Sequence, residues 1–266
     1  MRPKFKENLP LVKYGLYITA QNLVNYFSSR VDQLIIGKFL GADILGVYST
    51  LKELLSKPVF QFINPMLNRV AFPVLSKSDL DKRITVYSRL NRIMYLISIP
   101  CFIVLYIHLD VFIKVALGEK WLSYIDISKY LILMLMIISI GNPVGILIKS
   151  FGKVKIGLIW EINVSIIRVL LLFIFVGYGI NTLIISQIIY SLLILLFQYF
   201  FIVRKIIEYK FIDWLGNITF GLTFSLLIFF IHYVFVNYFN VYMLLLLEGS
   251  VFIFMVFTFK NKIKLS

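Results

Sequence analysis

The feature that most constrains this chain is a series of long apolar segments separated by short polar or Gly/Pro breaks. The segments cover about 14–36, 45–67, 90–109, 129–148, 156–177, 182–203, 217–236 and 241–259. A helix of about 20 apolar residues crosses a hydrocarbon core about 30 Å thick. Only 15% of the residues are charged, against about a quarter in a water-soluble domain. The sequence therefore predicts an all-α integral membrane protein with about eight transmembrane helices.

The composition also excludes several classes of function. The spans leave only short loops, with no room for a soluble catalytic domain, and the chain carries no P-loop, G-x-S-x-G or H-E-x-x-H motif. The single Cys has no disulfide partner within the chain, and the two His are far apart in the sequence. We therefore expect no enzyme, no cofactor and no metal site.

Lys and Arg are distributed unevenly between the two sides that eight alternating spans define. With residues 1–13 inside, 18 of the 27 basic residues fall on inner segments and four on outer segments. This asymmetry satisfies the positive-inside rule and predicts that both termini are cytoplasmic. The net charge of +14 is then a signal of topology and of affinity for anionic lipid headgroups. No nucleic-acid-binding motif accompanies it, so nucleic acid is not an expected partner.

The first two segments are unusually polar for membrane helices. At 100° per residue, Asn22, Asn25 and Asp32 share one sector of the first helix. In the second segment polar residues recur every three or four positions, at Glu53, Lys57, Gln61, Asn64 and Asn68. Two prolines, Pro58 and Pro65, are expected to kink this helix. We interpret the two stripes as the lining of a hydrated cavity; the alternative is that they seal helix to helix through internal hydrogen bonds.

Later segments contain isolated ionisable residues. Glu161 and Arg168 share one face of the fifth segment, and each is a functional candidate because a charge in hydrocarbon needs a partner or water. A purely structural interhelical pair is the alternative. Glu248 in the last segment is either an ion site or a helix-packing carboxyl. For His108 and His232 we expect interfacial positions at the outer ends of their spans rather than a proton relay.

Isolated cations in a cavity suit a substrate that carries phosphate. Guanidinium binds phosphate oxygens in pairs, and ammonium acts as a compact point charge. The predicted substrate-binding residues are Arg30, Lys52, Lys57, Arg168, Asn22, Asn25, Gln61 and Asn64. The predicted ion-coupling residues are Asp32, Glu161 and Glu248.

Three stretches carry a resemblance to a known family. The longest runs from Asn25 to Ser49, NYFSSRVDQLIIGKFLGADILGVYS. The others are NRVAFPVLS, from Asn68 to Ser76, and LGEKWL, from Leu117 to Leu122. Together they resemble bacterial oligosaccharide flippases of the O-antigen and colanic-acid exporter type, within the superfamily of multidrug, oligosaccharidyl-lipid and polysaccharide exporters. The likeness covers most of residues 10–205.

This resemblance implies a fold and a domain organisation. Such exporters have about fourteen spans in two six-helix lobes and two terminal helices, with the substrate between the lobes. The chain resembles the second lobe with the two additional helices. It would then consist of a cytoplasmic segment at 1–13, a six-helix MATE-like lobe at 14–205, and two further helices with a short cytoplasmic tail at 206–266. A separate chain that supplies the first lobe is an expected partner.

The resemblance also implies a function. We expect a half or truncated transporter in the bacterial plasma membrane that flips undecaprenyl-diphosphate-linked oligosaccharide by alternating access, for a surface polysaccharide such as the O-antigen of lipopolysaccharide. Its partners would be the lipid-linked oligosaccharide and membrane lipids. Two alternatives stay open: a cation- or proton-coupled drug antiporter of the same superfamily, and a membrane scaffold or relic that transports nothing.

Overall fold

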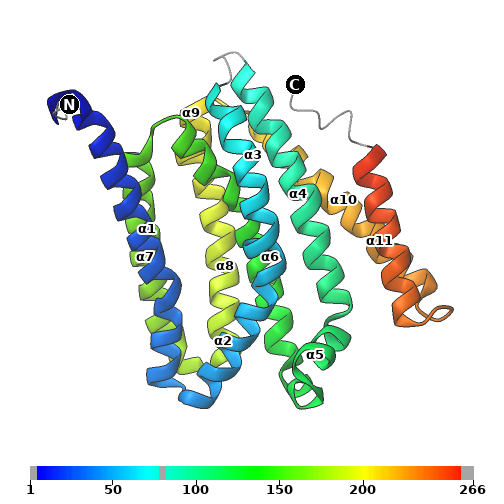
Figure 1. Ribbon diagram of the computed structural model, residues 1–266. Coiled ribbons are helices and arrows are strands. Elements are labelled where there is room, and N and C mark those ends of the chain that lie inside the picture. Colours follow the sequence, from blue (N-terminus) through cyan, green and yellow to red (C-terminus); the bar gives the residue numbers. More distant parts are fainter. Residues whose placement is uncertain (1–4, 78–81, 259–266) are drawn as a thin grey trace.

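The computed structural model describes residues 5–77 and 82–258, and every regular element within these ranges is helical. The long helices form an elongated bundle (Figure 1). The start of α1 (Phe5–Phe39) and the last described turns of α11 (Val241–Thr258) lie at the same end of the bundle. The short helix α5 (Leu109–Leu117) lies at the opposite end. The prediction of an all-α membrane protein is confirmed.

Five helical rods are long and apolar enough to cross a membrane. They correspond to the third to seventh predicted segments. Their elements are α4 (Arg83–Ile107); η3 (Glu119–Tyr124) with α6 (Ile125–Ser150); α7 (Val154–Phe175) with η4 (Val176–Tyr178); α8 (Ile180–Gln198) with η5 (Tyr199–Val203) and α9 (Arg204–Ile207); and α10 (Phe211–Phe235). The apolar helix α11 follows α10. The chain is therefore a multi-pass helical membrane protein.

The two polar segments form rods of similar length that are not among these five. One is α1, and the other joins α2 (Ala42–Ser56), η1 (Lys57–Ile63) and α3 (Asn64–Lys77). The chain reverses between the two rods at Gly41, whose φ of 90° is accessible to glycine without strain. The π-helical turn η1 includes Pro58, which cannot donate a backbone hydrogen bond. A local departure from α-helical geometry thus lies at Pro58, one of the two positions where a kink is expected.

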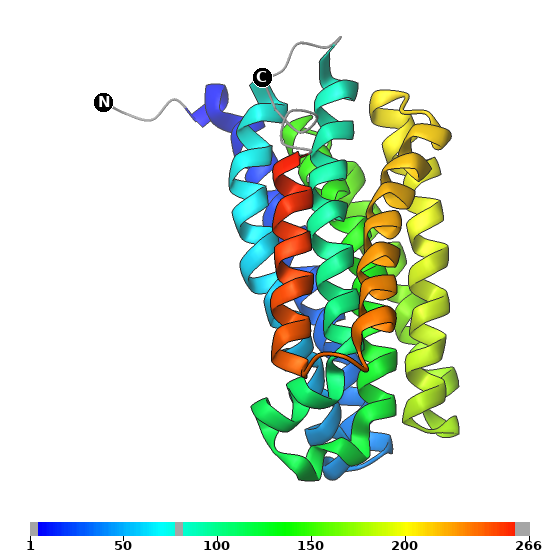
Figure 2. The same ribbon diagram turned by 90° about the vertical axis from the view of Figure 1, so that its right-hand side faces the viewer.

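Close helix packing holds the terminal hairpin against the bundle. Figure 2 shows α4, α10 and α11 next to one another. Gly221 of α10 faces the backbone of α4, and a Cβ atom at this position would lie 2.9 Å from the carbonyl oxygen of Tyr95. Small residues permit such approaches, which supply much of the packing energy between helices in lipid. Gly221 therefore allows α10 to contact α4 along its length.

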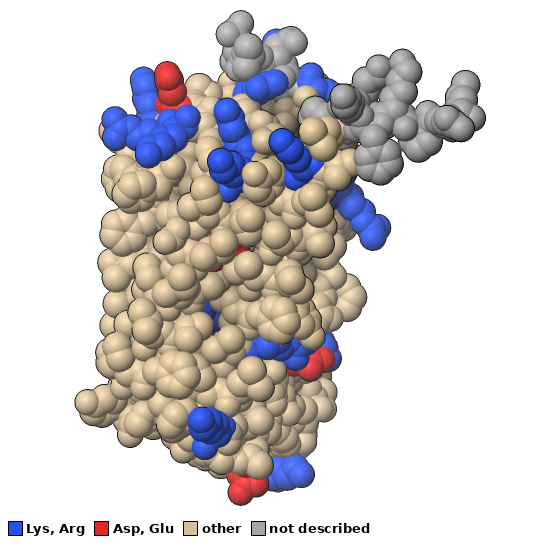
Figure 3. Space-filling view, turned by 90° about the vertical axis from the view of Figure 1, so that its left-hand side faces the viewer, with Lys and Arg blue, Asp and Glu red and all other residues tan. Residues whose placement is uncertain are grey.

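On the face of the molecule that contains α1 and α7, charge is concentrated at one end. Figure 3 shows Lys and Arg gathered at the end where α1 begins, above a broad belt with few charged side chains. Fewer charged side chains mark the other end of this face. This distribution matches the asymmetry of basic residues in the sequence and places the belt at the depth of the hydrocarbon.

Candidate functional site

A buried charged cluster lies where α1, α2 and α7 meet. The side chain of Asp32 on α1 is 0% exposed. Its Oδ2 accepts hydrogen bonds from Lys52 Nζ of α2, from Arg168 Nη2 of α7 at 3.3 Å, and from the hydroxyl of Tyr48 at 2.7 Å. Both cations form ion pairs with this carboxylate. The cluster therefore carries two positive charges and one negative charge.

The local sequence explains why these groups meet. After the turn at Gly41, α2 runs back along α1, and positions 48 and 52 are one helical turn apart on the same face. Their side chains consequently reach the same carboxylate. In hydrocarbon, a buried carboxylate is stable only with such partners. Lys52 and Arg168, predicted as substrate cations, and Asp32, predicted as an ion site, thus form one structural unit.

A polar pocket of about 420 Å³ opens next to this cluster, between α1, α6, α7 and α8. Arg168 belongs to both the pocket and the cluster. The other polar residues of the lining include Gln21, Asn22, Asn25, Asn142, Glu161 and Gln187. Figure 3 shows charged atoms recessed within the apolar belt on the face of α1 and α7. A polar pocket is therefore present, and the stripe of α1 forms one of its walls. The stripe of the second segment, which was interpreted as lining the same cavity, contributes none of its residues to this pocket.

Several amide groups of this pocket are unsatisfied. The Oε1 atom of Gln21, the Nδ2 atom of Asn142 and the Nε2 atom of Gln187 are buried and have no hydrogen-bond partner among the described residues. Buried polar atoms in native proteins almost always have partners, so these three indicate that water or a ligand enters the pocket. None of the three is among the substrate-binding residues predicted from the sequence. The feature of the sequence that identifies them is an isolated amide side chain within an apolar span.

Glu161 and Arg168 contact α1 rather than each other. Glu161 Oε1 accepts a hydrogen bond from Asn25 Nδ2 at 3.0 Å, whereas Arg168 bonds to Asp32. Asn25 and Asp32, the two partners on α1, both belong to its polar stripe. The interhelical pairing that was left open as a structural alternative is therefore present, and the same residues also line the pocket.

The rest of the predicted substrate set lies elsewhere. Arg30 is exposed, and its Nη1 lies 3.4 Å from Gln33 Oε1. Lys57 pairs with Glu53 at 3.2 Å, four positions away on the same helix face. Neither side chain lines the polar pocket. Gln61 is exposed and Asn64 is buried, and both also lie outside the pocket lining.

The last predicted ion-coupling residue forms a separate group. Glu248 of α11 bonds to His108 and His232, on the side of the bundle opposite α1 and α7 (Figure 1). His108 is 6% exposed and lies at the end of α4, so its side chain packs inside the protein, while its interfacial depth stays a prediction. The expectation that distance in the sequence keeps the two histidines apart is wrong. Their ring centroids are 5.0 Å apart because α10 packs along α4.

Known proteins share sequence with much of the chain. The family described as polysaccharide biosynthesis protein matches residues 1–126. Teichuronic acid biosynthesis protein TuaB of Bacillus subtilis (strain 168) is 31% identical over 168 residues, which are 62% of this chain and 35% of TuaB. Lipopolysaccharide biosynthesis protein WzxC of Escherichia coli (strain K12) is 28% identical over 149 residues, covering 55% of this chain and 30% of WzxC. Amylovoran biosynthesis protein AmsL of Erwinia amylovora is 28% identical over 210 residues, covering 76% and 53%.

These matches confirm the resemblance to polysaccharide exporters. The chain spans about a third to a half of the length of the curated relatives it matches. No solved structure matches it significantly. The matched family region includes the whole of α1 and α2, and hence the Asp32 and Lys52 members of the buried cluster. Over this region the chain is thus similar to proteins named for polysaccharide biosynthesis.

Proposed function

We propose that this exporter-like chain forms part of a transporter that flips an undecaprenyl-diphosphate-linked oligosaccharide across the bacterial plasma membrane. The relatives are named for three different products, teichuronic acid, lipopolysaccharide and amylovoran. Such variety fits a carrier that recognises a common lipid diphosphate and tolerates different sugars. The observation that carries the proposal is the polar pocket at the level of the apolar belt, with Arg168 at its edge.

The chemistry of the pocket suits both parts of this substrate. Sugar hydroxyls donate and accept hydrogen bonds, and the unsatisfied amides of Gln21, Asn142 and Gln187 offer both functions. The adjacent cluster has a net positive charge, and Arg168 can turn from Asp32 to a phosphate oxygen because both are charged acceptors. Lys52 would then keep Asp32 paired. Substrate binding would therefore replace the hydrogen bond between Arg168 and Asp32 with one between Arg168 and a phosphate oxygen.

Alternating access would require a second lobe opposite the pocket. We place this lobe in a separate segment or chain that faces α1 and α7. We place both ends of the chain in the cytoplasm because the basic end of the bundle contains the start of α1. The rocking of two lobes would open the pocket to each side of the membrane in turn. The transport step itself needs no covalent chemistry.

The drug-antiporter alternative has less support from the site. An antiporter for cations needs carboxylates that are available to a cation or a proton. Asp32 is already paired with two cations, and Glu161 accepts a hydrogen bond from Asn25. Glu161 remains the pocket carboxylate to which we assign any ion coupling, because it lines the cavity.

Binding to a lipid diphosphate tests the proposal directly. The full chain is placed in nanodiscs of zwitterionic lipid, and the affinity for undecaprenyl diphosphate is measured by native mass spectrometry. Loss of a charged hydrogen bond and reversal of its charge predict at least about tenfold weaker binding for Arg168→Glu. Arg204→Glu, which changes an exposed arginine of α9 outside the pocket, is the matched control and should bind within about twofold of the unaltered chain.

Equal affinities for the two variants would contradict the proposal. The scaffold alternative has its own test in cells whose surface polysaccharide depends on this gene. Replacement of both Gln21 and Gln187 by Leu should abolish export if the pocket carries the substrate. Unchanged export would favour the scaffold.

A further inference from the structure

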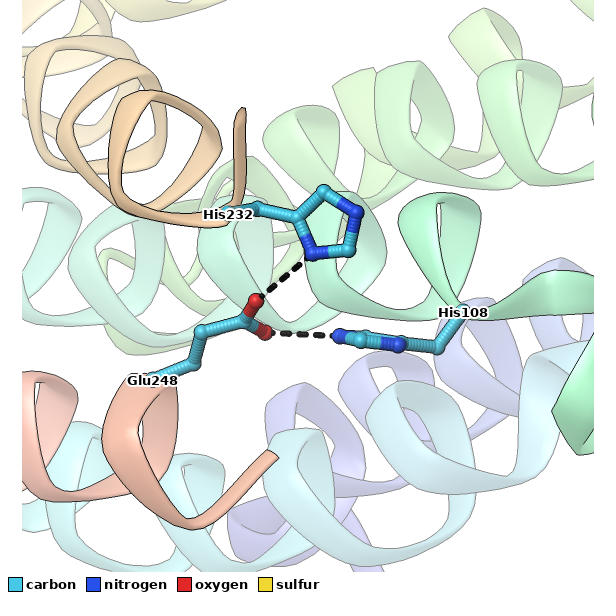
Figure 4. Close-up of side chains that lie close together, drawn as sticks. All are labelled: His108, His232 and Glu248. Carbon is cyan, nitrogen blue, oxygen red and sulfur yellow. Dashed lines mark hydrogen bonds and ion pairs between the residues drawn. The ribbon is translucent and has the colours of Figure 1, made fainter. Parts of the chain in front are cut away.

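The two histidines of the chain converge on one buried carboxylate (Figure 4). His108 lies at the junction of α4 and α5, His232 in the last turn of α10, and Glu248 in α11. The Nε2 atom of His108 is 2.9 Å from Glu248 Oε2, and the Nδ1 atom of His232 is 3.0 Å from Glu248 Oε1. Three separate elements thus contribute one potential ligand atom each.

Burial and charge set this group apart from a surface cluster. The side chains of His108, His232 and Glu248 are 7%, 19% and 1% exposed. The ion pairs that Glu248 makes within the described residues go to these two imidazoles and to no Lys or Arg. Asp110, which follows closely in α5, is exposed, and the next basic residue, Lys114, pairs with Glu119 at 2.6 Å. Within the described residues, the partners of this buried carboxylate are thus two imidazoles, the side chains that most often bind transition metals.

We propose that His108, His232 and Glu248 form a binding site for a divalent transition metal of the Zn²⁺ type. Two imidazole nitrogens and one carboxylate oxygen are a common ligand set for zinc sites that keep a fourth position for water. Imidazole favours zinc, copper, iron and nickel, whereas magnesium and calcium prefer sites made of oxygen ligands. The donor set therefore selects a transition metal.

The geometry fits this set with small side-chain movements. Bonds of about 2.0–2.1 Å in a tetrahedral site place neighbouring ligand atoms about 3.3 Å apart. The two nitrogen–oxygen separations, which involve different oxygens of Glu248, are a few tenths of an ångström shorter. One ligand atom from each of the three residues lies within 4.8 Å of the other two. A slight opening of the two hydrogen bonds would admit the ion. Each neutral imidazole would bind the metal through the nitrogen that faces Glu248 and carry its hydrogen on the other ring nitrogen.

The position of the site gives it a structural role. The ligands join the α10–α11 hairpin to the corner between α4 and α5, and α11 follows α10 through a short connection (Figure 2). A bound metal would fasten the two terminal helices to the six-helix lobe. The site is separate from the polar pocket, so its test does not depend on the transport proposal.

Metal titration of the full chain tests the site. The protein is purified in detergent without a polyhistidine tag, stripped with a chelator, and titrated with Zn²⁺ or Co²⁺. We expect one ion per chain and the visible absorption of four-coordinate Co²⁺. At a hundredfold excess of Zn²⁺ over Kd, the Tm should rise by about 5–10 °C.

Two variants and a matched control assign the ligands. Glu248→Gln keeps the shape of the side chain and a hydrogen-bond acceptor, and His232→Asn removes one imidazole. Each should lose the Co²⁺ absorption and weaken Zn²⁺ binding by at least about 100-fold. Asp110→Asn neutralises an exposed carboxylate two residues from His108 and should bind as the unaltered chain does. If a ligand variant does not fold, the Co²⁺ spectrum of the unaltered chain decides alone: its absence at one equivalent overturns the proposal, as does full binding by Glu248→Gln.

Discussion

The substitution Asp32→Asn tests whether the buried cluster holds α1, α2 and α7 together. It keeps the shape of the side chain but removes the charge that pairs with Lys52 and Arg168. Each of these cations is 18% exposed, so water would screen them only partly once the carboxylate is gone. Breaking a buried ion pair costs about 3–5 kcal/mol. Because the two cations are partly exposed, we expect Asp32→Asn to lower the free energy of unfolding by about 3 kcal/mol, the lower end of this range.

Thermal unfolding in detergent measures this loss. At about 2–4 °C per kcal/mol for a chain of this size, Asp32→Asn should lower the Tm by about 6–12 °C. Asp43→Asn, which neutralises an exposed carboxylate in the first turn of α2, is the control and should cost less than about 1 kcal/mol. In the double variant Asp32→Asn with Lys52→Met, one of the two unpaired cations is gone. We therefore expect it to recover about 1–3 kcal/mol relative to additive effects.

Two results would refute this reasoning. One is a Tm for Asp32→Asn that equals that of the Asp43→Asn control. The other is strict additivity in the double variant, since Lys52 and Asp32 would then be energetically independent.

Two further predictions concern helix packing and the pocket. Gly221→Ala should destabilise the protein by about 1–3 kcal/mol because its Cβ would meet the Tyr95 carbonyl oxygen at 2.9 Å. Gly216→Ala on the same helix places its Cβ in open space and should stabilise the protein by about 0.5–1 kcal/mol. Equal Tm values for the two variants would contradict this account of the packing. Gln187→Leu removes an unsatisfied buried amide and should leave the Tm unchanged or raised while it reduces undecaprenyl diphosphate binding, and a large loss of stability would show that this amide has a structural partner.

The sequence predicts the membrane helices well because the length of an apolar run is a local property. Each strongly apolar segment became a helix that is long enough to span a bilayer, apart from the shorter α11. The polar stripe of α1 also predicted a cavity wall, since a helix fixes which side chains share a face. The partners across that wall were not predictable. Whether Arg168 meets Asp32 or Asn25 on α1 depends on how α7 crosses α1, which the sequence of either helix alone does not encode.

The histidine group shows the same limit more sharply. His108 and Glu248 are 140 positions apart, and no local pattern connects them. They meet because Gly221 lets α10 approach α4 closely and because the short connection returns α11 beside α10. A small residue at a helix contact thus determines which distant ionisable groups come together.

Water access to the stripe of α1 tests the central claim most directly. Asn22 lines the polar pocket, while its neighbour Leu23 points to the outer apolar surface at nearly the same depth. In a Cys101→Ser background, Asn22→Cys and Leu23→Cys are treated with a membrane-impermeant maleimide, which reacts with a hydrated thiolate. The account predicts that Asn22→Cys reacts and is protected by undecaprenyl diphosphate, while Leu23→Cys stays unreactive. Equal lack of reaction at both positions in the assembled transporter would contradict it.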